Sequence, residues 1–219
     1  MLNWRALEER GLYTIVTEND ARSHRIQAEF LTSAPRLKDC PPPDQPEIAF
    51  AGRSNAGKSS VLNQLTGTKS LARTSKTPGR TQLINFFSTD AGGRLVDLPG
   101  YGYAKAAKQL KAQWQAHLED YLARRTALVG LILVMDIRHP LQPFDQQIVE
   151  WSRVSGLRLH ILLNKADKLK HGARMNALHA VQRALANQPQ CSVQLFSATS
   201  GLGRDDAMDL IRAWLGEGL

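Results

Sequence analysis

The sequence contains little cysteine, no long apolar run and no surplus of acidic residues. Its two cysteines, Cys40 and Cys191, stand far apart without CxxC spacing, which argues against a disulfide framework or a cysteine zinc site and favours a reducing compartment. The longest apolar run, residues 127–135, is well short of the ~20 residues that span a bilayer, so it predicts a buried strand. The N-terminus has no apolar region typical of a secretory signal. Together these absences predict a cytoplasmic protein without a transmembrane segment.

Basic residues are in clear excess. The chain has 28 lysines and arginines against 20 aspartates and glutamates, which gives a net charge of +8 and a pI near 9.8. Such an excess favours polyanionic partners, either nucleic acid or an anionic membrane face, and does not distinguish between them. The length of 219 residues and the 42% of hydrophobic residues are ordinary for one globular domain. The sequence does not fix the oligomeric state, and a monomer is expected.

Short apolar segments alternate with longer amphipathic segments after residue 46. This alternation predicts an α/β fold with a mostly parallel central sheet and helices on both faces. Residues 1 to about 46 carry little pattern and end in a stiff proline-rich spacer, so they are predicted to form an arm. The predicted strands are 47–51, 82–88, 94–97, 128–136, 157–164 and 191–196. The predicted helices are 58–65, 105–125, 144–155, 172–187 and 204–215.

A phosphate-binding loop follows the first of these strands. Residues 52–59 match the GxxxxGK[ST] pattern without a gap. The loop must turn its backbone N–H groups around a phosphate; Gly52 and Gly57 permit the tight bends, and the following helix presents its positive end. The pattern predicts that Lys58 contacts the β- and γ-phosphates and that the Ser59 hydroxyl binds Mg²⁺. It does not distinguish ATP from GTP. The predicted contact residues are Gly52, Arg53, Ser54, Asn55, Ala56, Gly57, Lys58 and Ser59.

A second motif lies at the end of the strand 94–97. Residues Asp97, Leu98, Pro99 and Gly100 follow the DxxG pattern. Asp97 is predicted to hold Mg²⁺ through a water, and the Gly100 backbone N–H to contact the γ-phosphate. Next comes Tyr101, where Ras-like enzymes have a glutamine that orients the attacking water. Since a phenol does not perform that task in the same geometry, we expect unaided hydrolysis to be slow.

A guanine-recognition motif follows the strand 157–164. Its residues are Asn164, Lys165, Ala166 and Asp167, in the NKxD pattern. The aspartate can accept hydrogen bonds from N1–H and the exocyclic amine of guanine, and adenine would leave it unpaired. Asn164 is expected to tie this loop to the phosphate loop, and Lys165 to lie along the base. The last strand ends in Phe196, Ser197 and Ala198, where the Ala198 N–H can donate to guanine O6.

With these motifs in order, the chain resembles the small bacterial GTPases of the TrmE–Era–EngA–YihA group and is most similar to the EngB (YihA/YsxC) family. The segments that carry the likeness are PEIAFAGRSN at 46–55, SKTPGRTQ at 75–82, NFF at 85–87 and DLPGYGYA at 97–104. The resemblance covers roughly residues 27–215 and implies a Ras-like P-loop GTPase domain at 27–219. Residues 1–26 would then be an N-terminal extension of unknown role.

The resemblance also implies an activity and further site residues. It implies a Mg²⁺-dependent GTPase, binding GTP and GDP, that acts in assembly of the large ribosomal subunit and is linked to cell division and septation. Thr81 would be a second Mg²⁺ ligand that closes over the γ-phosphate, and the catalytic set would be Lys58, Thr81 and Gly100. Asn55 occupies the position whose side chain helps to coordinate K⁺ in potassium-activated relatives. Alternatively, it only forms hydrogen bonds within its own turn. The nucleotide contacts would extend to Gly79, Arg80, Thr81, Gln82 and Leu83.

Two basic groups flank the predicted switch segments, and they are either solvated faces or contacts to ribosomal RNA. Three functions therefore remain in competition. The first is a GTPase switch on ribosomal particles; the second is a P-loop ATPase or small-molecule kinase, against which Asp167 argues; the third is a GTP-gated scaffold at the division machinery that hardly hydrolyses GTP. The basic residues are Lys69, Arg73, Lys76 and Arg80 before the second strand, and Lys105, Lys108 and Lys111 after Tyr101.

Overall fold

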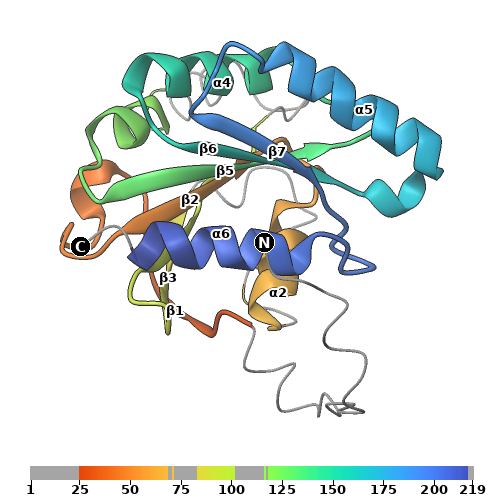
Figure 1. Cartoon of the computed structure of the whole chain (residues 1–219). Coiled ribbons are helices and arrows are strands. Elements are labelled where there is room, and N and C mark those ends of the chain that lie inside the picture. Colours follow the sequence, from red (N-terminus) through yellow and green to blue (C-terminus); the bar gives the residue numbers. More distant parts are fainter. Residues whose placement is uncertain (1–24, 69–70, 72–82, 102–115, 117, 217–219) are drawn as a thin grey trace, which may run out of the picture.

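The computed structural model describes residues 25–68, 71, 83–101, 116 and 118–216, and these form a seven-stranded sheet covered by helices (Figure 1). The strand order is β1-β3-β4-β2-β5-β6-β7, antiparallel across the first three strands and parallel across the rest. The strands are β1 Ala28–Ala34, β2 Glu47–Gly52, β3 Ile84–Thr89, β4 Arg94–Asp97, β5 Leu128–Asp136, β6 Leu159–Asn164 and β7 Cys191–Leu195. The α-helices described over their full length are α2 Lys58–Thr66, α4 Pro143–Ser155, α5 His171–Ala184 and α6 Arg204–Gly216, and short 3-10 turns occupy Leu37–Asp39 and Ala166–Lys168.

Both faces of the sheet are buried, as a parallel sheet requires. Alternate residues of β5 belong to two separate cores: Leu131, Leu133 and Met135 lie in one, and Ile132 and Val134 in the other. Helices α4 and α5 cover the first face, and α2 and α6 cover the second (Figure 1). The predicted α/β architecture is thus confirmed. Within the described part of the chain, no helix is long and apolar enough to cross a membrane.

Most predicted elements agree with the structure to within a few residues. The predicted strand at 157–164 begins two residues later, and the predicted helix at 172–187 runs from His171 to Ala184. Of the predicted helix at 105–125, residues 116 and 118–124 are described and helical.

The prediction that residues 1–46 form a weakly patterned arm is wrong for β1. This strand pairs antiparallel with β3 and forms one edge of the sheet. Its apolar pattern is hidden because Phe30 and Leu31, which are consecutive, are both exposed, and because the pairing shifts register between Phe30 and Thr32. An alternating pattern identifies a strand only where one face is continuously buried.

The proline-rich segment at 41–46 is held by a buried charge network. Glu47 is fully buried; it accepts hydrogen bonds from the Arg125 guanidinium and the Tyr121 hydroxyl, and Arg94 lies 3.4 Å away. The two arginines also donate to the carbonyl oxygens of Pro41 and Pro42, both at 2.8 Å. The segment is therefore anchored at the start of β2 rather than a free spacer.

The sheet brings the phosphate loop, the DxxG motif and the NKxD motif to one edge. Strands β2, β4, β5, β6 and β7 run parallel, so their carboxyl ends lie together. Gly52, Asp97, Asp136, Asn164 and Phe196 stand at or just after these ends. Ligands of open α/β sheets bind at this edge.

Candidate functional site

The phosphate loop connects β2 to α2 in a conformation that two glycines make possible. A Cβ atom at Gly52 would lie 2.7 Å from the Val134 carbonyl oxygen, so only glycine lets the loop leave the sheet here. Gly57 caps α2 with φ +98° and would place a Cβ atom against the Asn164 side-chain amide. Asn55, at φ 66°, makes the left-handed bend between them. The loop thus turns around the N-terminus of α2, the arrangement that binds phosphate.

Lys58 and Asp97 meet at the centre of the site. Lys58 is in the first turn of α2, Asp97 is the last residue of β4, and their side chains form a buried ion pair. The predicted phosphate-binding cation and the predicted magnesium carboxylate are thus neighbours. Ser59 follows Lys58 in the same turn. A carboxylate and a hydroxyl are suitable oxygen ligands for Mg²⁺, so the residues present fit this ion.

Asn164 joins the phosphate loop to the predicted guanine-recognition loops. Its side chain is buried at the end of β6; its Nδ2 donates to the Ala56 carbonyl oxygen at 2.9 Å, and its Oδ1 accepts the Ala198 N–H at 3.1 Å. Three segments that are far apart in the sequence therefore share one amide group. The Ala198 N–H, predicted to donate to guanine O6, is directed at Asn164 in this structure.

Asp167 is held as a charged acceptor. The Ser197 hydroxyl donates to its Oδ1 at 2.7 Å, and the Lys168 ammonium lies 3.0 Å from its Oδ2. The Ser197 hydrogen bond, followed by that from Lys168, lowers the pKa of the Asp167 carboxyl below its ordinary value. At neutral pH the group is ionised and suited to accept hydrogen bonds from two donors.

Asp136 belongs to the site although the sequence analysis gave it no role. It ends β5, and its Oδ2 lies 3.0 Å from the Lys165 ammonium, which also donates to the Asn55 carbonyl oxygen at 2.5 Å. Arg138 holds the same carboxylate through two hydrogen bonds. Burial alone would raise the pKa of Asp136, but the bonds from Arg138 and Lys165 outweigh it and lower the pKa well below the ordinary value. The available signal was an acidic residue at the carboxyl end of a strand next to the phosphate-loop strand.

The Tyr101 side chain is buried against α4. Its side chain is 2% exposed, and its hydroxyl donates to the buried Asp145 of α4 at 2.5 Å. Its ring packs on Phe144 with centroids 4.3 Å apart. Burial and the nearby Asp145 carboxylate raise the pKa of the phenol well above its ordinary value, so it remains a donor. The sequence marked Tyr101 as a departure from Ras-like enzymes, but nothing in it indicated Asp145 as the partner.

Part of the predicted site falls outside the described residues. These predictions are Gly79, Arg80, Thr81 and Gln82, together with the basic residues Lys69, Arg73, Lys76, Lys105, Lys108 and Lys111. Leu83 is described and 38% exposed, just before β3. The structure thus brings together the phosphate loop, Asp97, Gly100 and the NKxD residues. The nucleotide contacts proposed for residues 79–82 stay predictions.

Comparison with known proteins agrees with this arrangement. Residues 47–165 match the protein family described as 50S ribosome-binding GTPase. Among solved structures, the chain is similar to a probable GTP-binding protein engB, with a TM-score of 0.62 and 22% identity over 78% of this chain and 99% of that chain. It is also similar to Era in complex with MgGDPNP and nucleotides 1506-1542 of 16S ribosomal RNA, with a TM-score of 0.60 and 22% identity over 78% of this chain and 56% of that chain.

A third similar structure is the bacterial selenocysteine-specific elongation factor EF-Sec, with a TM-score of 0.55 and 24% identity over 80% of this chain and 29% of that chain. The chain thus spans nearly all of the engB structure, about half of Era and less than a third of EF-Sec. At these identities the likeness shows the fold, that of a P-loop GTPase.

Proposed function

We propose that this GTP-binding protein is an EngB-type switch acting in assembly of the large ribosomal subunit. The chain belongs to the family of 50S ribosome-binding GTPases, and this membership supports the proposal. The observation that carries the proposal is the Asn164 side chain, which joins the phosphate loop to the guanine-recognition loops. The near-complete coverage of the engB structure also supports it. Residues 27–219 would be the GTPase domain and residues 1–26 an extension of unknown role. A link to cell division and septation is part of the proposal and rests on the family resemblance.

GTP hydrolysis is expected to require Mg²⁺ and to be slow without a partner. Ser59, Asp97 and Thr81 are the proposed magnesium ligands, with Asp97 acting through a water. Catalysis of phosphoryl transfer depends on positioning and on stabilising charge. Since Tyr101 is turned into the core, no side chain at position 101 orients the attacking water. The unaided rate should be on the order of 10⁻⁴–10⁻³ s⁻¹, as in Ras without an activator.

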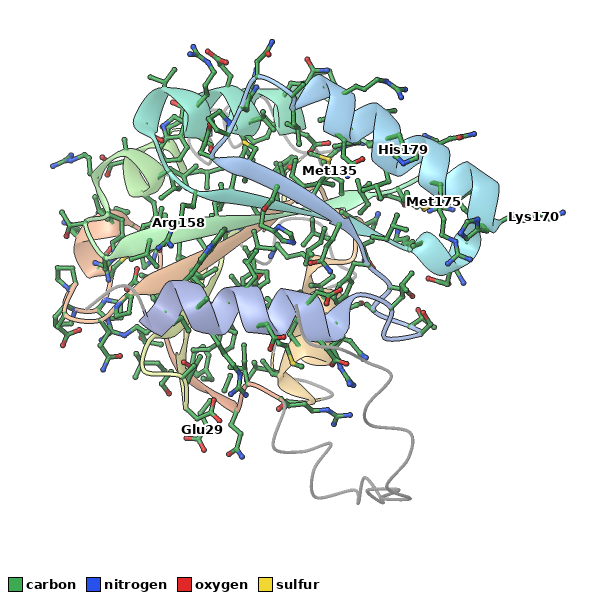
Figure 2. The ribbon with its side chains drawn as sticks, in the orientation of Figure 1. Glu29, Met135, Arg158, Lys170, Met175 and His179 are labelled. Carbon is green, nitrogen blue, oxygen red and sulfur yellow. The ribbon has the colours of Figure 1, made fainter. Side chains whose placement is uncertain are left out.

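The surface around α5 favours a polyanionic partner. Residues 168–204 contain no aspartate or glutamate, yet they include Lys168, Lys170, Arg174, Arg183 and Arg204. Lys170 and Arg183 are exposed, and Figure 2 shows Lys170 pointing away from the protein beside the start of α5. Ribosomal RNA is the partner that this charge and the family description together support. The similar Era structure contains nucleotides of 16S ribosomal RNA, so a small-subunit partner is the alternative to be tested.

Co-sedimentation on sucrose gradients tests the proposal. The protein is mixed with 50S or 30S particles in a GTP analogue, GDP or no nucleotide. We expect binding to 50S particles that is strongest with the GTP analogue and that weakens with added salt. Binding to 30S particles alone would move the proposal to the small subunit. Sedimentation with neither particle, combined with hydrolysis well below the expected unaided rate, would favour the scaffold at the division machinery.

Substitutions in the phosphate loop should separate the roles of its two polar side chains. Lys58→Ala removes a cation from the β- and γ-phosphates, so GTP and GDP affinities should fall together by about 1.5–3 kcal/mol, the contribution of a hydrogen bond to a charged group. Ser59→Ala should mainly raise the Mg²⁺ concentration required for hydrolysis. Titrating Mg²⁺ against activity distinguishes them; an unaltered magnesium requirement in Ser59→Ala would assign the ligand to another hydroxyl.

Potassium dependence tests the second proposed role of Asn55. If this residue helps to hold K⁺ beside the phosphates, the ion supplies positive charge near the transferred group. Replacing Na⁺ by K⁺ at equal ionic strength should then speed hydrolysis several-fold, and Asn55→Ala should abolish the difference. Equal rates in both salts would restrict Asn55 to shaping its own turn, where its φ of 66° already places it.

A further inference from the structure

Tyr101 is joined to the phosphate loop through its backbone. Its carbonyl oxygen accepts the Ser54 N–H at 2.7 Å, and its N–H points to the Gly52 carbonyl oxygen at 3.4 Å. These bonds continue the parallel pairing of β2 with β4, but with a changed register. Phe50 pairs with Asp97, and Arg53 pairs with Tyr101. The segment from Asp97 to Tyr101 is therefore one residue longer than the segment of β2 and the phosphate loop that it faces.

This extra residue places Gly100 against the phosphate loop. The segment is held before it, where the Leu98 N–H donates to the Phe50 carbonyl oxygen at 3.0 Å, and after it by Tyr101. A Cβ atom at Gly100 would lie 3.6 Å from both the Gly52 carbonyl oxygen and the Ser54 nitrogen. The position of the Gly100 N–H, the proposed γ-phosphate contact, therefore depends on how firmly Tyr101 is fixed.

The Tyr101 side chain is fixed by a residue of α4. Asp145 is 1% exposed and uses both oxygens: Oδ1 accepts the Tyr101 hydroxyl at 2.5 Å, and Oδ2 accepts the Gln142 N–H at 2.9 Å, which caps the helix. Burial raises the pKa of the Asp145 carboxyl, and its hydrogen bonds and the charge of Arg53 only partly oppose this. A buried, fully used carboxylate of this kind holds its partner in one geometry.

We propose that Asp145 and Tyr101 form a positioning pair, whose hydrogen bond fixes Gly100 for contact with the γ-phosphate and thereby raises the affinity for GTP relative to that for GDP. The role proposed for both residues is to position Gly100, not to contact the nucleotide. The pair also keeps the side chain at position 101 in the core. It connects the segment that contains Gly100 to the first turn of α4. This inference rests on the proposed function, because it requires Gly100 to contact the γ-phosphate.

The test compares two tyrosines that make the same kind of buried bond. Tyr101→Phe keeps the ring and removes the hydroxyl bonded to Asp145. Tyr121→Phe is the matched control, since the Tyr121 hydroxyl donates to the buried Glu47 at the opposite end of β2, away from the phosphate loop. Affinities for a non-hydrolysable GTP analogue and for GDP are measured in Mg²⁺, together with thermal unfolding.

We expect Tyr101→Phe to lower affinity for the GTP analogue about tenfold, the scale of one hydrogen bond to a charged group, and to change GDP affinity less than threefold. Tyr121→Phe should lower the unfolding temperature and leave the ratio of the two affinities unchanged. Asp145→Asn should have an intermediate effect, because its single oxygen can serve Tyr101 or Gln142 but not both. Adding Tyr101→Phe to Asp145→Asn should give no larger change than Tyr101→Phe alone.

Two results would overturn the inference in different ways. If Tyr101→Phe or Asp145→Asn leaves the ratio of the GTP-analogue affinity to the GDP affinity at its wild-type value, the positioning role is wrong and the proposed function stands. The positioning role is also wrong if Tyr121→Phe alters the ratio of GTP-analogue to GDP affinity as much as Tyr101→Phe does. If the wild-type protein itself binds neither guanine nucleotide, the proposed function fails and the inference fails with it.

Discussion

Replacing Asp167 by asparagine should weaken GTP binding by about 2–4 kcal/mol, which is the cost of unpaired and mismatched polar groups in a recognition site. The carboxylate accepts from two donors, whereas an amide offers one acceptor oxygen and turns its NH₂ group toward a guanine donor. Xanthosine triphosphate has a carbonyl where guanine has the exocyclic amine, so its affinity for the variant should rise. The preference between the two bases should therefore reverse. Competition of GTP, xanthosine triphosphate and ATP against a fluorescent guanine nucleotide measures this.

The neighbouring Lys168→Gln provides the matched control. The Lys168 ammonium lies 3.0 Å from Asp167 Oδ2, but the Lys168 side chain is 57% exposed. Its removal should leave the base preference unchanged, because the Ser197 hydroxyl still holds the carboxylate. Unaltered affinities for GTP and xanthosine triphosphate in Asp167→Asn would refute the guanine-recognition assignment. Equal competition by ATP in the wild-type protein would favour the ATPase or kinase alternative.

The central features of the fold could be predicted because each has a local signal. The strand at Leu128–Asp136 is a continuous apolar run, as expected for a strand buried on both faces, and its predicted bounds agree with β5. The phosphate loop and the NKxD segment each follow such a strand. Since the carboxyl ends of parallel strands meet at one edge, placing the motifs on strands was enough to predict that they lie together.

The features that the sequence did not predict depend on contacts between residues far apart in the chain. Strand β1 at Ala28–Ala34 is an edge strand whose residues pair with β3 residues at least 50 positions away, and two consecutive exposed apolar residues hide its pattern. Asp136 ends an apolar run, and its role is visible only once Lys165, which follows the neighbouring strand β6, is placed beside it. Likewise Asp145 has the local signature of a helix cap, and no local pattern indicates that its second oxygen holds Tyr101.

The same distinction explains why Asn164 has a larger role than its motif suggests. Within NKxD it is one of four neighbouring polar or small residues. In the structure its amide is 2% exposed and links Ala56 in the phosphate loop with Ala198 after β7. Gly57 is also packed against it, with no room for a Cβ atom. Both loops that are predicted to contact the nucleotide are therefore positioned by this side chain.

Asn164→Ala should consequently impair binding of every guanine nucleotide. The substitution leaves the buried Ala56 carbonyl without its partner, which costs about 1–3 kcal/mol. It also removes the bond that holds the part-buried Ala198 N–H, so the guanine-recognition loop loses its link to the phosphate loop. We expect GTP and GDP affinities to fall together by a hundredfold or more, without the reversed base preference of Asp167→Asn. Asn164→Asp should not restore binding, because a carboxylate oxygen would then face the Ala56 carbonyl oxygen.

The control for this prediction is Asn176→Ala, which makes the same chemical change at an exposed position of α5. Nucleotide affinities are measured by calorimetry, and unfolding is followed with and without GDP. In the wild-type protein GDP should raise the unfolding temperature, since a ligand bound only by the folded state stabilises it. In Asn164→Ala that increase should be small, whereas Asn176→Ala should keep it in full. A folded Asn164→Ala protein with wild-type affinities would mean that the phosphate and guanine loops hold their positions independently.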